Sequence, residues 1–203
     1  RTCLVGSEMC IRDSSKANKE LFDLATKFNI PVVTTLMGRG AFPDGHELCL
    51  EMPGMHGNYT ATTSIQKSDL LIAIGVRFDD RVTANPSFFA QNAKVIHADI
   101  DPAEIGKVRE AQVPIVGDAK SVILGLIDAL QDEELDTKNW INELNSMKTE
   151  HPLSYNQDEN GPLKVPFVLE ELQDLTEEGA IVVSGVGQHQ MWISQHWNFT
   201  EPN

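Results

Sequence analysis

Hydrophobic positions recur at helical spacing in several segments of the chain. Ala17, Leu21, Leu24, Ala25 and Phe28 predict a helix that ends before Pro31. The same spacing predicts helices over 58–67 and 119–130, and the second turns its apolar positions inward: Val122, Ile123, Leu126, Ile127 and Leu130. A polar amphipathic helix is expected through Lys148, another over 166–175, and the Asp101-Pro102 pair predicts a further helix start.

Short apolar runs between these helices predict strands. They cover 31–35, 69–75, 94–100 and 113–117, and the second and third are almost continuously apolar. Such runs are typical of strands that are covered on both faces. Because short strands alternate with helices, we expect an α/β fold with a parallel, Rossmann-like sheet. The segment 38–57 is rich in glycine and loop residues and is too long for a simple connection.

The pattern changes after the first 150 residues. We expect one α/β domain over 15–150, a proline-containing linker over 151–165, and a second α/β unit that begins at 166. This unit would hold the helix 166–175, a strand over 180–184 and a Gly-x-Gly turn that opens a helix. So short a unit cannot bury a core, so we expect a truncated second domain, marginally folded beyond residue 166, in a sequence cut at both ends.

The first residues do not fit this pattern. Leu4 to Asp13 reads LVGSEMCIRD, which has no clear period and resembles the translation of a transposase sequencing adapter. We therefore interpret 1–14 as an adapter-derived, non-native segment and exclude it from the fold. A short natural strand and loop is the alternative. Under the first interpretation Cys3 and Cys10 are not native, which leaves Cys49.

Charge and composition exclude some classes of protein. Sixteen Lys and Arg against thirty Asp and Glu give a net charge of −14. This argues against a nucleic-acid or anionic-membrane surface, but a few arginines and helix N-termini can still bind an anionic cofactor locally. No apolar run approaches the ~20 residues of a membrane helix. Three cysteines without a disulfide or metal pattern suit a reducing cytoplasm.

Three loops follow predicted strands with residues suited to a nucleotide. Gly75 opens a run with two arginines and two aspartates, Asp99-Ile-Asp101 follows the next strand, and Gly117-Asp118 follows the last. Ligands of parallel α/β sheets lie at such strand ends, so the loops together predict a bound nucleotide. Taken singly, each also fits a strand stop, an N-cap or a tight turn.

Other motifs favour some chemistries over others. No Gly-x-Gly-x-x-Gly fingerprint occurs, which disfavours an ordinary dinucleotide dehydrogenase. The histidines share no metal-ligand spacing, so we expect no metal ligands among them, and His97, inside a strand, is interpreted as structural. The string GVGQHQ over 185–190 fits an anion-binding turn or a purely structural one.

Several strings taken together resemble one enzyme family. They are GAFP over 40–43, GMHG over 54–57, SDLLIAIGVRFDDRVT over 68–83, KVIHADIDPAEIGK over 94–107, VPIVGD over 113–118 and GVGQHQMW over 185–192. From about residue 16 to 200, the chain resembles the large catalytic subunit of acetohydroxyacid synthase (acetolactate synthase), a thiamine-diphosphate enzyme.

The resemblance implies three α/β domains, of which 15–150 is the central, FAD-binding one and 166–203 the start of the thiamine-diphosphate domain. It implies FAD contacts at Thr35, Leu36, Pro53, Gly54, Met55, His56, Gly75, Val76, Arg77, Phe78, Asp79, Asp99, Ile100, Asp118 and Ala119. Thiamine diphosphate would be held at Val186, Gly187, Gln188 and His189. Met55 and Arg81 would face the second 2-ketoacid, whose carboxylate the arginine can pair with.

The resemblance also implies the reaction and the partners. The whole enzyme decarboxylates pyruvate and ligates it to a second 2-ketoacid in branched-chain amino-acid synthesis, as a homodimer or tetramer with a regulatory small subunit. The catalytic glutamate and the Gly-Asp-Gly motif for Mg²⁺ fall outside this chain, so we expect the fragment alone to be inactive. The alternatives are a related carboligase, such as a glyoxylate carboligase or an FAD-free acetolactate synthase, and a non-catalytic nucleotide-binding module.

Overall fold

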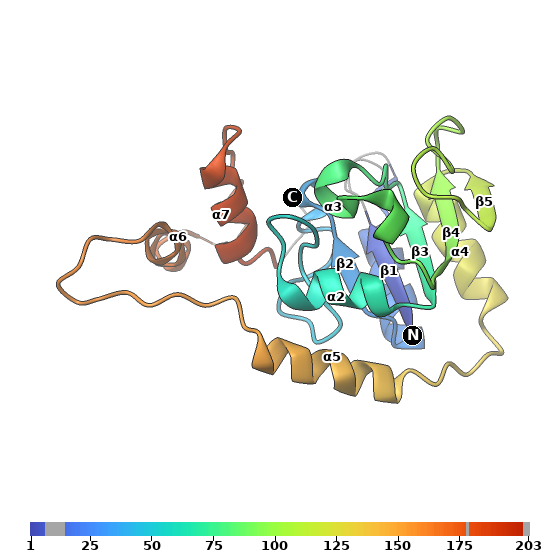
Figure 1. Cartoon of the computed structure of the whole chain (residues 1–203), viewed down its shortest axis with the longest axis horizontal. Coiled ribbons are helices and arrows are strands. Elements are labelled where there is room, and N and C mark those ends of the chain that lie inside the picture. Colours follow the sequence, from blue (N-terminus) through green and yellow to red (C-terminus); the bar gives the residue numbers. More distant parts are fainter. Residues whose placement is uncertain (7–14, 178, 201–203) are drawn as a thin grey trace.

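Five parallel strands form one sheet at the centre of the molecule (Figure 1). The computed structural model describes residues 1–6, 15–177 and 179–200. The strands lie in the order β2-β1-β3-β4-β5. Their bounds are β1 Thr2–Gly6, β2 Val32–Thr34, β3 Leu70–Ile74, β4 Lys94–Asp99 and β5 Val113–Val116. The predicted parallel α/β fold is therefore confirmed.

Strand β1 shows that residues 2–6 lie in the sheet, which corrects their exclusion from the fold. Leu4 pairs with Val32 of β2 on one side and with Ile72 of β3 on the other, so β1 joins the two halves of the sheet. Cys3, Leu4 and Val5 are at most 1% exposed. A five-residue run shows too little period for the pattern to identify it, but three apolar side chains between two strands bury well. Residues 7–14, with Cys10, lie outside the described residues.

Helices cover both faces of the sheet, which gives three layers. On one face α1 (Asn18–Phe28) packs beside α4 (Ala119–Ala129), and on the other α2 (Tyr59–Lys67) packs beside α5 (Lys138–Glu150). Alternate residues of β3 enter the two cores: Leu71 and Ala73 face α2 and α5, whereas Ile72 and Ile74 face α1 and α4. This two-sided burial explains the continuously apolar strand sequence.

The C-terminal part leaves the sheet through an extended segment (Figure 1). It leads to α6 (Val165–Asp174) and α7 (Gln188–His196), which pack against each other at one side of the molecule. Shorter helical turns lie at the carboxyl edge of the sheet: η2 (Leu36–Gly38), α3 (Asp80–Thr83) and η3 (Pro86–Phe88).

Most predicted elements are present, and two are absent. Residues 101–109 form turns where Asp101-Pro102 predicted a helix: Asp101 caps a first turn by accepting a hydrogen bond from Ala103 N at 2.9 Å, but Gly106, with a φ of +74°, ends it. The expected strand over 180–184 forms no regular secondary structure and pairs with no strand of the described chain, and Ile181 is 78% exposed. An apolar run forms a strand only where a neighbouring strand accepts its hydrogen bonds.

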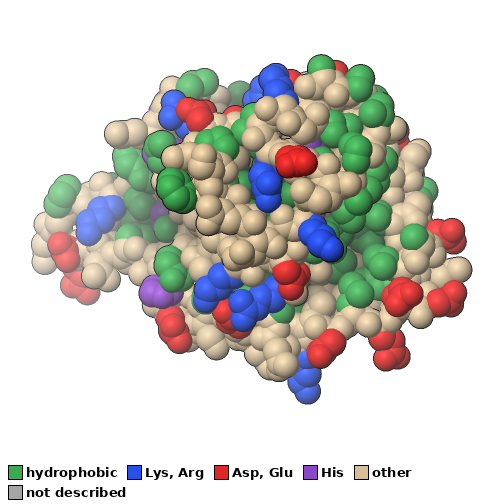
Figure 2. Space-filling view, turned by 45° about the vertical axis from the view of Figure 1, so that its right-hand side comes forward, with side chains coloured by type: hydrophobic (Ala, Val, Ile, Leu, Met, Phe, Trp, Pro, Cys, Tyr) green, Lys and Arg blue, Asp and Glu red, His purple; other side chains and the backbone are tan. Residues whose placement is uncertain are grey.

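The surface carries the acidic excess of the sequence. Figure 2 shows acidic side chains gathered toward the lower right edge of one face, and a group of basic side chains beside acidic ones near its lower centre. Within the described ranges, no helix is both long and apolar enough to cross a membrane.

Candidate functional site

A cavity of about 330 Å³ opens at the carboxyl edge of the sheet. One wall follows β2 and the other follows β3, so the cavity lies where the strand order reverses around β1. This reversal is the usual ligand position in open α/β sheets. The lining residues are Thr35, Leu36, Met37, Met52, Pro53, His56, Val76, Arg77, Phe78, Asp79, Arg81, Val82 and Met191.

The loop after β3 is shaped by Phe78 and Asp79. Phe78 has a φ of +53° and is 2% exposed, and its ring packs edge-on against His97 at 5.1 Å between centroids. The carboxylate of Asp79 accepts a hydrogen bond from Arg81 N at 3.1 Å and so caps the short helix α3. With Phe78 and Asp79 fixed, Arg77 and Arg81 point outward and are 70% and 69% exposed. Two exposed guanidinium groups therefore stand at the mouth of the cavity, each within 4 Å of a neighbouring carboxylate: Arg77 Nη2 lies 3.9 Å from Asp79 Oδ2, and Arg81 Nη1 lies 3.7 Å from Asp80 Oδ2.

The opposite wall is a loop that two glycines bring close to other backbone. Met55 N donates to Arg81 O at 2.9 Å, which ties this loop to α3. A Cβ on Gly54 would lie 2.3 Å from that same oxygen, and a Cβ on Gly57 would lie 2.2 Å from Met52 O. No larger side chain fits at either position without moving backbone, so these glycines set the width of the cavity.

His97 joins two of the strand ends. Its Nε2 lies 2.8 Å from Val76 O, after β3, and its Nδ1 accepts a hydrogen bond from Gly106 N at 3.4 Å, after β4. The ring is fully buried, and burial lowers the pKa of His97 below its ordinary 6.5. A neutral ring that donates from Nε2 and accepts at Nδ1 fits both contacts, which supports the structural interpretation of this histidine.

The aspartates at the next two strand ends bind local backbone. Asp99 is 6% exposed and accepts from Asp101 N at 2.9 Å. Asp118 caps α4 by accepting from Ser121 N at 3.2 Å, and Ser15 donates to its other oxygen. Ile100 and Val116 are both 62% exposed. This part of the edge therefore presents apolar side chains, and both carboxylates have a turn-forming role.

The predicted diphosphate turn lies at the start of α7. Gly187 is the N-cap residue with a φ of +150°, and the first turn of the helix holds no acidic residue. A Cβ on Gly185 or Gly187 would lie 3.3 or 3.1 Å from the His189 ring, so the two glycines let this ring fold back over the turn. Val186 is 91% exposed. A helix N-terminus without a nearby carboxylate suits an anionic group.

The structure brings together only part of the predicted site. Nine of the residues named from the sequence line the cavity: Thr35, Leu36, Pro53, His56, Val76, Arg77, Phe78, Asp79 and Arg81. Gly54, Met55 and Gly75 shape its loops, whereas Asp99, Ile100, Asp118 and Ala119 lie farther along the sheet edge. Val186, Gly187, Gln188 and His189 open α7.

Sequence reasoning missed four lining residues: Met37, Met52, Val82 and Met191. Met191 comes from α7, and no local spacing could show that this helix lies against the loops after β2. The chemistry of the residues present fits a flat, largely apolar ring system with cations at one end. Among the described residues, no group of three or more His, Cys, Asp or Glu is arranged to hold a metal ion.

The two described cysteines are not suited to nucleophilic chemistry. Burial raises the pKa of both Cys3 and Cys49 to about 12, and neither forms a disulfide. Both remain neutral thiols that pack in the core.

Comparison with known proteins identifies the family of this fold. Residues 4–126 match the family model described as "Thiamine pyrophosphate enzyme, central domain". The match begins inside β1, as expected if that strand belongs to the domain. The acetolactate synthase of Mycobacterium leprae (strain TN) is 51% identical over 191 residues, and the acetolactate synthase large subunit of Corynebacterium glutamicum is 48% identical over 189 residues.

A plant relative extends the comparison. Acetolactate synthase 1, chloroplastic, of Nicotiana tabacum is 43% identical over 192 residues. These alignments cover 92% of this chain for the two bacterial relatives and 93% for tobacco, but only 31%, 30% and 29% of the relatives' own lengths. The chain thus spans about 30% of the proteins it resembles, and it belongs to the thiamine pyrophosphate enzymes, whose central domain it contains.

Proposed function

We propose that the chain is the central, FAD-binding part of an acetolactate synthase large subunit, together with the start of its thiamine-diphosphate domain. The observation that supports this most is the cavity at the strand reversal, with apolar walls and two exposed arginines. Apolar walls fit the flavin ring, and arginines at the mouth fit its diphosphate. Farther along the edge, Ile100 and Val116 offer apolar contact for the adenine.

The proposed reaction is the decarboxylation of pyruvate and its ligation to a second 2-ketoacid. Thiamine diphosphate supplies the carbanion-stabilising chemistry of such enzymes when it is bound. The helix start at Gly187, Gln188 and His189 would bind its diphosphate through backbone N–H groups. Arg81, with its exposed guanidinium, would orient the carboxylate of the second 2-ketoacid beside Met55. Mg²⁺ would be held by residues outside this chain.

The proposed assembly and location follow from the same identity. We propose that the large subunit works as a homodimer or tetramer with a regulatory small subunit; the words "large subunit" in the name of the Corynebacterium relative fit the presence of a small one. The 2-ketoacids are its small-molecule partners, and we expect it to act in the cytoplasm without nucleic acid or membrane. A module that binds a nucleotide without catalysis is the second candidate, favoured by the cavity where the strand order reverses, the usual nucleotide position in open α/β sheets.

FAD binding by the purified 203-residue chain tests the proposal. Flavin fluorescence should be quenched on addition of the chain, and Arg77→Gln should weaken the binding because a cation at the cavity mouth is lost. Lys107→Gln is the matched control, since Lys107 pairs with Glu104 outside the cavity. Binding of ADP as tight as that of FAD would favour the nucleotide-binding module. No binding of FAD would contradict the flavin site.

A further inference from the structure

A buried ion pair lies beside the cavity and plays no part in the proposed chemistry. Nη2 of Arg39 lies 2.6 Å from Oδ2 of Asp44, and the two side chains are 5% and 6% exposed. Nη1 of Arg39 also donates to Thr34 Oγ1 at 3.3 Å, at the end of β2. Removing two charges from water costs free energy that the pair alone seldom recovers. The presence of this buried pair is better explained by the segment of the chain that it contacts.

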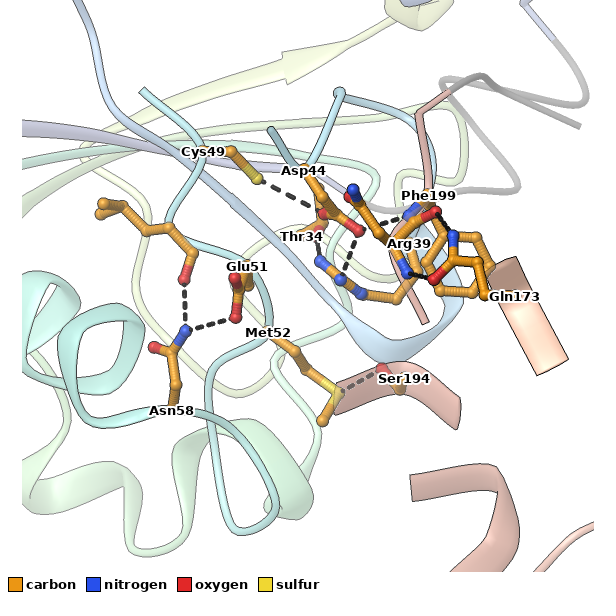
Figure 3. Close-up of polar contacts among 12 residues, drawn as sticks. Thr34, Arg39, Asp44, Cys49, Glu51, Met52, Asn58, Gln173, Ser194 and Phe199 are labelled. Carbon is orange, nitrogen blue, oxygen red and sulfur yellow. Dashed lines mark hydrogen bonds and ion pairs between the residues drawn. The ribbon is translucent and has the colours of Figure 1, made fainter. Parts of the chain in front are cut away.

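The pair binds the segment that follows α7 (Figure 3). Phe199 N donates to Asp44 Oδ2 at 2.8 Å, and Asp44 N donates to Phe199 O at 3.0 Å. The guanidinium of Arg39 lies 5.5 Å from the centroid of the Phe199 ring, within the range of a cation–π contact. Both members of the ion pair therefore contact one residue that is more than 150 positions away in the sequence.

Helix α7 also contacts the loop that forms one cavity wall. Ser194 Oγ lies 3.1 Å from Met52 Sδ, and Gln195 Nε2 donates to His56 O at 2.7 Å. Met191, on the same helix, lines the cavity itself. The helix thus reaches the cavity along its length, and Phe199 holds the chain just after its end.

We infer that Arg39 and Asp44 are positioning residues: by holding Phe199, they fix α7 and its Met191 against the cavity. The docking of α7 rests on the contacts above alone. Its consequence for cofactor binding rests on the proposed function. Two separate measurements distinguish these parts.

Hydrogen exchange measures the docking without any cofactor. Phe199→Ala removes the ring but leaves the ion pair in the central domain intact. Exchange of the amides over 187–199 should become about fivefold faster, the size expected for a partly exposed cation–π contact, while β3 is unchanged. Phe88→Ala is the matched control, because Phe88 is 69% exposed and outside these contacts. Equal exchange over 187–199 in the two variants would overturn the docking.

Asp44→Asn gives a second measure of the same contact. It preserves the size of the side chain but leaves Arg39 without its counter-charge. The amide exchange rate over 187–199 should therefore increase more than it does in Phe199→Ala. Exchange of β3 reports whether this variant still folds. If it does not, the Phe199→Ala result decides the question alone.

Flavin affinity measures the positioning. In a chain that binds FAD, Phe199→Ala should raise the dissociation constant several-fold, because the wall that carries Met191 is no longer fixed, and Phe88→Ala should leave it unchanged. Faster exchange with unaltered FAD affinity would overturn the positioning role. If the unaltered chain binds no FAD, the proposed function fails, and the exchange measurement still decides the docking.

Discussion

Replacing Leu4 by alanine tests whether β1 supports the sheet. Leu4 is fully buried in the core between the sheet and helices α1 and α4, with Val32 and Ile72 among the residues of that core. It pairs with both of these residues across the two neighbouring strands. A leucine-to-alanine change in such a site removes transfer free energy and leaves a cavity, so we expect a loss of about 3 kcal/mol in the free energy of unfolding.

Urea unfolding followed by circular dichroism measures this loss. A change of that size should also lower the melting temperature by about 6–12 °C in a chain of this length. Leu163→Ala is the control, because Leu163 is 70% exposed in the segment before α6 and should change little. A loss below about 1 kcal/mol for Leu4→Ala, similar to that of the control, would refute the central position of β1 and restore the exclusion of residues 2–6 from the fold.

Three further predictions concern single contacts. Because burial lowers the pKa of His97, the unfolded chain binds a proton near pH 6.5 that the folded chain does not. As the pH is lowered through about 6.5, the free energy of unfolding should therefore decrease, and it should decrease less steeply in His97→Gln. Urea titrations at several pH values measure this difference. Gly57→Ala would place a Cβ 2.2 Å from a backbone oxygen and should weaken FAD binding at least several-fold, whereas Gly45→Ala, with open space around it, should not; flavin titration compares them. Trp140→Phe removes the 3.1 Å hydrogen bond from Trp140 Nε1 to Thr2 O and should cost about 1 kcal/mol in urea unfolding, and an unchanged free energy would argue against the packing of α5 on β1.

The sequence predicted the helices and strands that can be recognised from the hydrophobic pattern of their own residues. Strand β3 is apolar at every position because both faces are covered, and the apolar stripe of α4 buries Ile123 fully and Leu126, Ile127 and Leu130 in part. Strand β1 could not be recognised in this way, since its assignment depends on pairing with residues about 30 and 68 positions later. The run 180–184 shows the opposite error: its composition fits a strand, but no strand of the described chain pairs with it.

The position of the candidate site could be predicted because the strands of the sheet are parallel. Once parallel strands were expected, their carboxyl ends had to meet at one edge, where three loops were predicted to bind a ligand. Of these, only the loop that begins at Gly75 lines the cavity, and Thr35 on the other wall was named from the family resemblance. The roles of single side chains did not follow from this. The carboxylates of Asp99 and Asp118 were expected to contact a ligand; each accepts a hydrogen bond from nearby backbone, and their contact with a ligand stays a prediction. Met191 required the docking of α7, which only long-range contacts reveal.

The central place of β1 also has a consequence for how the chain folds during synthesis. This strand leaves the ribosome before both of its neighbours, and its partners on β3 begin only at Leu70. Until then its backbone N–H and C=O groups and its apolar side chains have no sheet to join, and such exposed edges favour association with other chains. A nascent chain halted between β2 and β3 should therefore need chaperone protection that one extended past β3 no longer needs.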